Sequence, residues 1–389
     1  MPVFISLIFL LSLNRPVAPV FQAQTIDSSL SIGYGLALSD VDGDGKIDIL
    51  LADKKQFVWY RNGDWKKFVM IENLTQFDNV CIAARDITGD GKCEVAVGAQ
   101  WNPSETSDDT KSGSVHFLVR PADPTQRWKA IELHHEPTIH RMRWVQSAAG
   151  KFFLVVLPLH GRGNSAGAGE GVKVLAYEYP KNVDGPWPMQ TLLNSMHLTH
   201  NLDPFESPNN AKKGLYVAGK EGIRFIPAEY KRPDSEKVEM MAGLSKPAGE
   251  VRVGRLSSTK NFVATVEPMH GTEVVVYLPG RQAQRIVVDD DVKEGHALAA
   301  ADFYGTGKDQ LVAGWRVPNK SGKVGIKLYA RTDASEDRWE SFWVDDNGMA
   351  CEDLQVADLN GDGKPDIVAS GRATRNLKIY WNKNGKDPS

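Results

Sequence analysis

The chain has few cysteines, no surplus of positive charge and no long apolar run beyond its first residues. Three cysteines in 389 residues exclude a dense disulfide framework and a four-cysteine zinc site. Lys and Arg total 46 against 49 Asp and Glu, a net charge of −3, which excludes sequence-independent binding of nucleic acid by a basic surface. With 41% hydrophobic and 24% charged residues, the chain has the composition of a globular protein with a large core, and we expect no membrane insertion of its body.

The N-terminus carries the one long apolar block, FISLIFLLSL at residues 4–13. This block is too short to span a bilayer and has the length of a signal-peptide core. We therefore predict a signal peptide over residues 1–18, with cleavage near Ala18, and a secreted or periplasmic protein. No Lys or Arg precedes the block, so a buried first strand is the alternative.

An internal repeat predicts the fold. A turn of the form D-x-D/N/T-G-x-G begins at Asp40, Asp86 and Asp358, and a weaker copy begins at Asp302. An alternating apolar run precedes each turn and a β-rich run follows it, which is typical of strand, tight turn, strand. Between these copies the turn chemistry is lost, but the same frame continues with turns at Ser147, Ser207 and Arg255. The chain thus divides into repeats of about 50 residues.

Most repeats contain four expected strands, which predicts an all-β, seven-bladed β-propeller of four-stranded blades. The last repeat ends after its third strand, and residues 20–26 (VFQAQTI) have the pattern of the missing fourth. We therefore expect the N-terminal strand to close the ring, with residues 19–389 forming one propeller domain.

The acidic turns are candidate calcium loops, because carboxylates alternate with glycines that tolerate positive φ. Two of them are complete or nearly so, and their candidate ligands are Asp40, Asp42, Asp44 and Asp48 in the first and Asp358, Asn360, Asp362 and Asp366 in the second. The alternative is an Asx/Gly turn without metal. An ion bound there would have a structural role.

The histidines concentrate on one predicted face of the disc. Eight of the nine fall in connections between blades or between the second and third strands of a blade, which share what we call the upper face. His140, His200 and His296 occupy equivalent places before an innermost strand, and His160 and His270 fall in turns. Such a ring suits zinc or a set of acid–base groups near neutral pH, although the mouths of propellers also collect polar residues without function.

The same face carries candidate substrate-binding residues. They are Tyr34, Trp101, Trp315, Arg316 and Arg372. Indoles stack on sugar rings and guanidinium groups hold sugar oxygens, but each of these side chains could equally serve packing. Residues 162–171 (RGNSAGAGEG) form a glycine-rich loop that could act as a lid.

The repeats resemble FG-GAP/VCBS propeller repeats. Segments 136–144, 157–163, 294–316 and 351–382 further resemble the propeller domain of aldos-2-ulose dehydratase and its bacterial relatives, whose additional cupin-like part is missing here. This resemblance implies a metal-assisted carbon–oxygen lyase that acts on a keto or anhydro sugar with zinc or magnesium as the divalent ion. It would place His200, His296 and His140 on the metal, and Arg372 and Arg316 on substrate oxygens. His160, His270 and His140 are then the candidates for proton transfer.

A non-catalytic extracellular propeller that binds glycans or a protein is the main alternative. Serine and two-carboxylate hydrolases are disfavoured, because the chain offers no G-x-S-x-G nucleophile elbow and no matching pair of inward acids is evident. Its one match to G-x-S-x-G, residues 163–167 (GNSAG), lies in the glycine-rich loop. The sequence does not predict the oligomeric state.

Overall fold

The computed structural model describes residues 16–207, 213–229, 239–240, 243–281, 283–332 and 337–385. Strands alone provide the regular structure of these residues, and none of them forms a helix long and apolar enough to span a membrane. Most of the expected signal peptide, residues 1–15, lies outside the described part.

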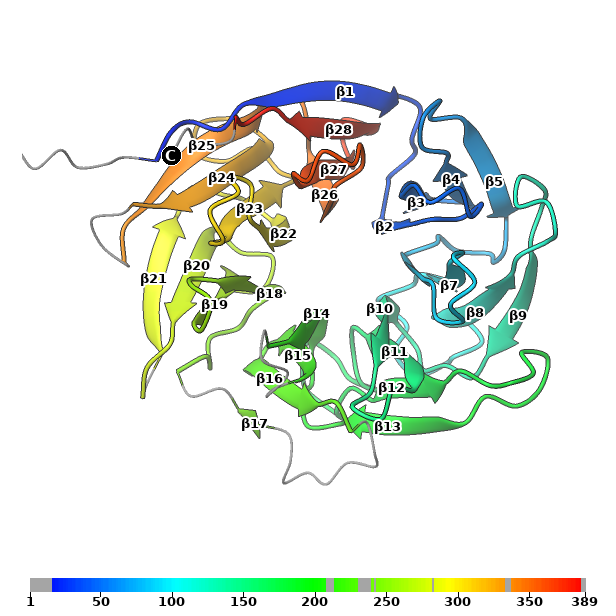
Figure 1. Ribbon diagram of the computed structural model, residues 1–389. Coiled ribbons are helices and arrows are strands. Elements are labelled where there is room, and N and C mark those ends of the chain that lie inside the picture. Colours follow the sequence, from blue (N-terminus) through cyan, green and yellow to red (C-terminus); the bar gives the residue numbers. More distant parts are fainter. Residues whose placement is uncertain are drawn as a thin grey trace, which may run out of the picture.

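Seven antiparallel sheets, each with four strands, stand around a central axis as the blades of a propeller (Figure 1). The predicted seven-bladed fold is thereby confirmed. Blades 1 to 3 comprise β2 (Gly35–Ser39), β3 (Asp48–Ala52), β4 (Gln56–Tyr60) and β5 (Lys67–Glu72); β6 (Cys81–Arg85), β7 (Glu94–Ala99), β8 (Ser114–Val119) and β9 (Lys129–Leu133); and β10 (Ile139–Gln146), β11 (Phe152–Pro158), β12 (Val174–Glu178) and β13 (Met189–Leu193).

Blades 4 to 7 complete the ring. They comprise β14 (Thr199–Glu206), β15 (Lys213–Gly219), β16 (Gly222–Pro227) and β17 (Glu239–Met240); β18 (Glu250–Arg255), β19 (Asn261–Glu267), β20 (Glu273–Leu278) and β21 (Gln284–Asp289); β22 (Gly295–Ala301), β23 (Gln310–Trp315), β24 (Gly325–Arg331) and β25 (Trp339–Asp346); and β26 (Cys351–Ala357), β27 (Asp366–Gly371), β28 (Asn376–Asn382) and β1 (Phe21–Asp27).

The N-terminal strand closes the ring, as predicted. β1 pairs antiparallel with β28, from Phe21 opposite Asn382 to Asp27 opposite Leu377. Beyond the strand, the Val20 amide donates to Asn384 Oδ1 at 2.7 Å, and the Tyr304 hydroxyl donates to the Val17 carbonyl at 2.8 Å. The last blade therefore consists of both ends of the domain.

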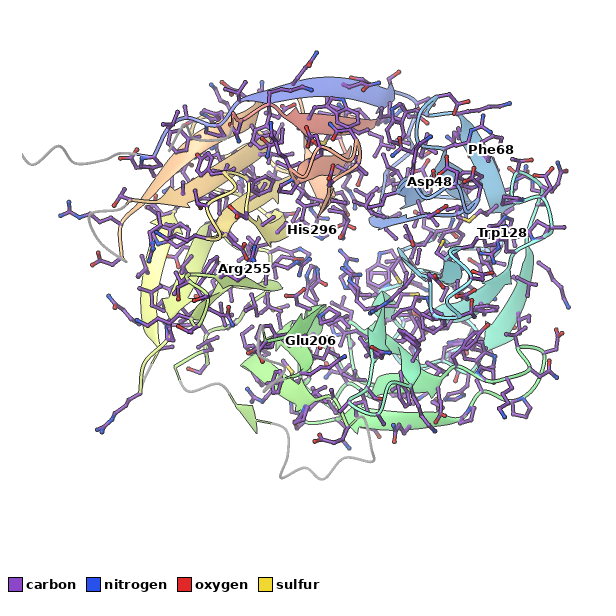
Figure 2. All side chains as sticks on the ribbon, viewed as in Figure 1. Asp48, Phe68, Trp128, Glu206, Arg255 and His296 are labelled. Atoms are coloured by element: carbon purple, nitrogen blue, oxygen red, sulfur yellow. The ribbon has the colours of Figure 1, made fainter. Side chains whose placement is uncertain are left out.

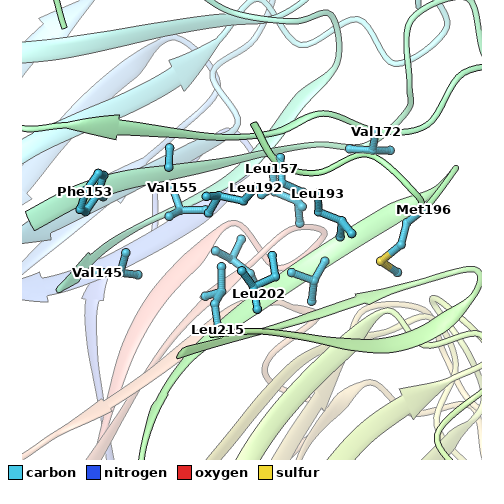
Figure 3. Packing of buried hydrophobic residues seen from close by; sticks show 14 of the residues in the cluster. Val145, Phe153, Val155, Leu157, Val172, Leu192, Leu193, Met196, Leu202 and Leu215 are labelled. Atoms are coloured by element: carbon cyan, nitrogen blue, oxygen red, sulfur yellow. The ribbon is translucent and has the colours of Figure 1, made fainter. Parts of the chain in front are cut away.

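The core lies between neighbouring blades, where the apolar faces of their sheets meet. Between blades 3 and 4, Val145, Val155 and Leu157 pack against Leu202 and Leu215 (Figure 3). The β-branched and leucine side chains of the second strands are nearly all inaccessible, because each such strand is covered on both faces. The packed blades hold their innermost strands, β2, β6, β10, β14, β18, β22 and β26, around the axis.

The acidic turns join the first and second strands of blades 1, 2, 6 and 7. Asp40 accepts the Gly43 and Gly45 amides at 2.7 and 2.8 Å, and the first Asp of each other turn binds backbone in the same way. The ninth residue, Asp48, accepts the amide of the second, Val41, and its counterparts Glu94 and Asp366 repeat this bond, whereas Gln310 accepts the amide of the third residue, Tyr304. These turns therefore close on their own backbone donors, with glycines at positive φ.

Candidate functional site

A single extra residue distinguishes the innermost strands of blades 3, 4, 6 and 7. The pairing register skips one residue near the start of each strand, and the skipped residues are His140, His200, His296 and Glu352. Blades 1, 2 and 5 pair without such a skip. A β-bulge frees backbone groups from the ladder and re-aims a side chain. The four bulges thus aim three imidazoles and one carboxylate out of the regular alternation.

Backbone carbonyls of the next blade orient the bulged histidines. His140 Nδ1 lies 2.9 Å from the His200 carbonyl, His200 Nδ1 lies 2.7 Å from the Gly249 carbonyl, and His296 Nδ1 lies 2.6 Å from the Glu352 carbonyl. A carbonyl only accepts, so each Nδ1 carries the proton and each Nε2 carries the lone pair. This tautomer is the one that binds a metal ion through Nε2.

Three imidazoles from three blades meet near the axis. Ligand nitrogens of His200, His270 and His296 all lie within 4.8 Å of one another. The ring centroids are 4.2 Å apart for His200 and His270, 4.7 Å for His270 and His296, and 5.1 Å for His200 and His296. Figure 2 shows His296 on the inner side of the ring, whereas Phe68 and Trp128 lie at its periphery. We call these three residues the imidazole cluster.

His270 differs from the other two members in how its proton is held. Its Nδ1 lies 3.3 Å from Arg316 Nη2, which can only donate, so the proton resides on Nε2, where His270 is hydrogen-bonded to His200 Nε2. A cation between the rings would replace that hydrogen bond and require the other tautomer of His270. His200 and His296 therefore already have the tautomer that binds a cation through Nε2, whereas His270 would have to change its tautomer.

Burial and positive neighbours keep the cluster neutral. Burial, followed by the charge of Arg141 for His200 and of Arg316 for His296, holds both imidazole pKa values well below the ordinary range. Burial, His200 and Arg316 lower the pKa of His270 to about 2. Neutral imidazoles are the metal-binding form, so these nitrogens require no deprotonation at neutral pH.

The donor set fits a borderline divalent ion. Three neutral nitrogens are the ligands of catalytic zinc sites that keep a fourth position open, whereas magnesium prefers oxygen. His140, expected as a ligand, lies beside the cluster: its centroid is 4.6 Å from that of His200, but Arg141 Nη1 donates to its Nε2 at 3.2 Å. His270 occupies the place in the nitrogen set that the sequence had suggested for His140.

His160 is not grouped with the cluster. It lies in the turn after β11, where its amide donates to Thr138 Oγ1 at 3.0 Å and its Nδ1 is buried without a hydrogen-bond partner among the described residues. Burial lowers its pKa. Nothing in these contacts connects it to the atoms that would face a substrate.

Two arginines converge on the buried carboxylate of Glu352. Arg316 donates from Nη1 to both carboxylate oxygens at 2.9 and 3.0 Å and from Nε to Glu294 at 2.9 Å. Arg372 donates to the same carboxylate at 2.9 Å but remains 41% exposed in its side chain. Arg316 is thus committed to protein contacts, whereas Arg372 keeps donors that can reach a ligand.

An aromatic wall continues from Arg372 around the mouth of the channel. The guanidinium carbon of Arg372 lies 5.4 Å from the Tyr34 ring centroid, and the Tyr34 hydroxyl donates to Asp78 at 3.0 Å. Asp78 bridges to the backbone of Trp101, whose ring centroid lies 5.1 Å from that of His140. Tyr34, Trp101 and Arg372 therefore belong to the same upper-face region as the cluster.

Trp315 does not reach this region. Its side chain is fully buried in the core between blades 5 and 6, and its indole nitrogen donates to the Lys323 carbonyl at 2.8 Å. The expectation that it contacts substrate is corrected, because a large indole at the end of a buried strand fills the core. Trp315 therefore has the packing role that the sequence analysis gave as the alternative.

Strained backbone precedes several site residues. Gln100, Thr138, Met269 and Glu294 have φ between 50° and 57°, and they lie one or two residues before Trp101, His140, His270 and His296. Such left-handed conformations are costly for residues other than glycine and are retained mostly at functional sites. Sequence reasoning had no signal for this strain, since none of these residues marks a turn.

Two charged residues of the site were missed or undervalued by sequence reasoning. Arg141 follows His140 directly, is 4% exposed, and lowers the pKa of all four upper-face histidines around it, after burial. Glu352 occupies the fourth bulge. The available signal for Glu352 was its equivalence in position to His140, His200 and His296, and for Arg141 it was the place directly after His140.

The lower-face acidic turns offer a separate carboxylate group. Oxygens of Asp40, Asp42 and Asp48 lie within 4.8 Å of one another. Asp44 is turned to its own neighbour, with Oδ1 accepting the Lys46 amide at 2.9 Å. Burial raises the pKa of Asp48 to about 7 and that of Asp366 to about 6, despite hydrogen bonds from backbone amides. Calcium in these turns remains a prediction.

Comparison with known families agrees with this architecture. Residues 40–97 match the FG-GAP-like repeat, and residues 112–279 match the family described as aldos-2-ulose dehydratase, beta-propeller domain. The chain is a seven-bladed propeller that contains an FG-GAP-like repeat and is similar to the propeller domain of aldos-2-ulose dehydratase, which suggests a carbohydrate-related role. The second match includes His140, His200 and His270. No curated protein sequence matches the chain.

Solved structures show the same fold at low identity. A chain of the Mitotic Checkpoint Complex has a TM-score of 0.58 at 10% identity, with 96% of this chain and 98% of that chain covered. BBS1N in complex with ARL6DN gives 0.57 at 13% identity, with 96% and 100% covered. The WD40 propeller domain of Doa1 gives 0.55 at 8% identity, with 95% and 100% covered. At such identities the likeness concerns the fold alone.

Proposed function

We propose that the protein is a secreted or periplasmic lyase that eliminates water or an alcohol from a keto or anhydro sugar, using a divalent ion held by the imidazole cluster. One observation carries the proposal: three neutral imidazoles from blades 4, 5 and 6 converge within 4.8 Å, two of them with Nε2 lone pairs preset by carbonyl acceptors. The match to the aldos-2-ulose dehydratase propeller supports the sugar as the class of substrate.

The metal fits zinc better than magnesium. His200, His270 and His296 would hold it, and in that position it would polarise the carbonyl group of a keto sugar. Arg372, with donors left beyond its bond to Glu352, would hold a sugar oxygen, and the rings of Tyr34 and Trp101 would border the sugar.

His140 is the residue we propose for proton removal. Its Nδ1–H is tied to the His200 carbonyl, so Nε2 is its one basic atom, and it is not needed for the ion. The hydrogen bond from Arg141 Nη1 to this nitrogen has to open before it takes a proton. The C–H bond beside the carbonyl breaks, the proton goes to His140 Nε2, and the electron pair moves toward the carbonyl oxygen. The electron pair then returns to form a C=C bond as the C–O bond at the β carbon breaks, and the leaving oxygen takes the proton from His140 Nε2 to depart as water or an alcohol.

The test combines metal content with a chromophore assay. Metal analysis of the purified protein should find about one zinc-like ion per chain, and incubation with a 2-keto or 3-keto sugar should produce an ultraviolet-absorbing enone. The His200→Ala/His296→Ala double variant should lose both, while His134→Ala, an exposed histidine of the same face, should lose neither. His296→Gln, which preserves size, serves if the double variant unfolds.

Full activity in the double variant would end the proposal. A folded wild-type protein that binds the sugar without forming a chromophore would instead favour the glycan-binding propeller.

A further inference from the structure

Six charged side chains lie on four of the innermost strands, which surround the central axis that we call the channel. Arg141 and Arg143 extend from β10, Asp203 from β14, Glu250 and Arg252 from β18, and Asp353 from β26. The charge of Arg143 interacts with Arg252, Asp353 and Asp203, which belong to blades 5, 7 and 4. Side chains of blades that are not neighbours meet in this way across the shared axis, around which the innermost strands stand (Figure 1).

The two arginines of β10 lack carboxylate partners. Arg141 is 4% exposed, and its Nη1 donates to His140 Nε2 at 3.2 Å and to the His140 carbonyl at 3.0 Å. Arg143 Nη1 donates to the Met142 carbonyl at 2.9 Å. Within the described ranges of the chain, neither guanidinium forms an ion pair. Each has five N–H donors, and the hydrogen bonds to described residues involve Nη1 alone.

The carboxylates of the channel are held by neutral donors instead. Asn201 Nδ2 donates to both oxygens of Glu250 at 2.7 and 2.8 Å, and the Leu36 and Leu354 amides donate to Asp353 at 2.7 and 2.8 Å. Of the three arginines, Arg252 alone lies within ion-pair distance of a described carboxylate, 3.5 Å from Glu250 and 4.0 Å from Asp203. Arg141 and Arg143 therefore have no contact pair among the described residues.

The two guanidinium groups without a carboxylate partner favour an added negative charge beside them. Burial raises the pKa of Asp203 and Asp353, against the lowering effect of the nearby arginines. Burial and then Arg252 lower the pKa of Arg143. A buried guanidinium without a carboxylate is costly, and its planar donor fork matches a carboxylate in shape.

We propose that Arg141 and Arg143, with Arg252 opposite, form an anion site below the imidazole cluster that takes the carboxylate of a sugar acid. The site itself rests on the geometry of the channel. Its assignment as part of the substrate site rests on the proposed function, because Arg141 contacts His140 and its charge acts on all three members of the cluster. The substrate would then be a keto sugar that also carries an acidic group.

Binding of chosen probes to the metal-free, full-length protein tests the anion site. In calorimetric titrations, D-glucuronate should bind at least about tenfold more tightly than D-glucose, which has the same ring without a carboxylate. Arg143→Gln should remove this difference and Arg143→Lys should restore part of it, since Arg143 does not contact the cluster. Arg127→Gln, which changes an exposed arginine just before the outermost strand of blade 2, is the matched control and should leave the preference for glucuronate unchanged.

A competition experiment with inorganic sulfate distinguishes a site for any small anion from a site for the carboxylate of a sugar acid. Competition between sulfate and glucuronate would support one anion site that accepts the sugar acid. Binding of sulfate with no preference for glucuronate over glucose would overturn the sugar-acid assignment, and no binding of either anion by the wild-type protein would overturn the site. These outcomes do not depend on a variant that folds.

The lyase proposal is tested separately with metal-loaded protein. A chromophore from neutral keto sugars without glucuronate binding would leave the lyase standing and remove the anion site. Carboxylate-dependent binding without turnover of any keto sugar acid would leave the anion site standing and remove the lyase.

Discussion

Gly249 sets how closely two segments of the site approach. A Cβ atom at this position would lie 2.4 Å from the carbonyl oxygen of Met269, the residue before His270, and the Gly249 carbonyl accepts Nδ1 of His200. We expect Gly249→Ala to displace both imidazoles and to weaken Co²⁺ or Zn²⁺ binding by about 10- to 100-fold, as changes behind a metal ligand do. The measurement is a titration followed by the visible absorption of Co²⁺.

The matched control is Gly385→Ala, where an added Cβ meets nothing within 4 Å. It should leave metal binding unchanged. Unaltered affinity in a folded Gly249→Ala protein would show that the carbonyl does not preset His200.

Asp48 should make the stability of the calcium-free protein depend on pH. Burial raises its pKa to about 7 from the ordinary 3.8. The fold therefore favours the protonated form, so this contribution to stability is complete below about pH 4 and is lost as pH rises to about 7. We expect Tm in the presence of a chelator to fall between pH 4 and 8 more steeply for the wild type than for Asp48→Asn.

Calcium gives an independent readout of the same carboxylate. If the first acidic turn binds the ion, added Ca²⁺ should raise Tm of the wild type at pH 8, where Asp48 is charged, and raise it less at pH 5. Asp90→Asn, in the turn weakened by Thr88, is the comparison that should retain the effect. Identical pH slopes for wild type and Asp48→Asn would contradict the assignment of the raised pKa.

The sequence predicted which residues gather at the site better than it predicted the role of each. His200 and His296 were expected together, and they are together, because their places in the repeat are equivalent. His270 was expected nearby but not among the ligands, since the direction of a turn side chain depends on backbone angles that its sequence does not reveal. Trp315 shows the opposite error, because an indole has the same signature whether it fills a core or borders a ligand.

At the scale of elements, the site depends on bulges that the sequence does not announce. The alternating pattern predicted each innermost strand, but one extra residue per strand cannot be located from hydrophobicity at a strand end. Once located, the bulges explain why four functional side chains share one direction and why the carbonyls of His200 and Glu352 are available to the preceding histidine. The apolar alternation thus predicts the strand, whereas the pairing register with its bulge determines which side chain of the strand enters the site.

The loop of residues 162–171 is tied down, in contrast to the flexible lid expected from its glycines. Arg162 donates to Glu136 at 3.1 Å and to Asp109 at 2.8 Å, and Asn164 donates to the His197 carbonyl at 2.9 Å. We expect Arg162→Ala to leave Tm nearly unchanged but to speed limited proteolysis within the loop several-fold, because loss of the two ion pairs frees its first residues. Peptide mapping by mass spectrometry measures the cleavage.

Arg61→Ala provides the control, since it removes an exposed ion pair with Asp64 far along the chain from this loop. It should not alter cleavage at residues 162–171. Equal proteolysis of all three proteins would mean that contacts other than those of Arg162 hold the loop.

At the scale of the whole molecule, the repeat made the fold predictable. Seven copies of one strand pattern, with a missing last strand and a spare first one, leave a closed ring as the arrangement that pairs every blade. The site was less predictable because it is a property of the closed ring: the imidazole cluster and its neighbours His140 and Glu352 come from blades 3 to 7, Tyr34 and Trp101 come from blades 1 and 2, and each preset histidine depends on a carbonyl of the next blade.

Opening the ring should therefore damage a site that the removed strand never touches. Deletion of residues 1–27 removes β1, leaves β28 as an exposed edge, and takes away the contacts of Val20 and Val17 with Asn384 and Tyr304. With this pairing lost, we expect Tm to fall by on the order of 10 °C and unfolding to become less cooperative. Because blades 6 and 7 then shift relative to each other, His296 should lose its fixed acceptor, and Co²⁺ affinity should fall together with Tm. Deletion of residues 1–15 alone is the matched control, since it retains β1 and should preserve both quantities. If the longer deletion kept full Co²⁺ affinity despite a lower Tm, the imidazole cluster would have to be held by the blades individually rather than by closure of the ring.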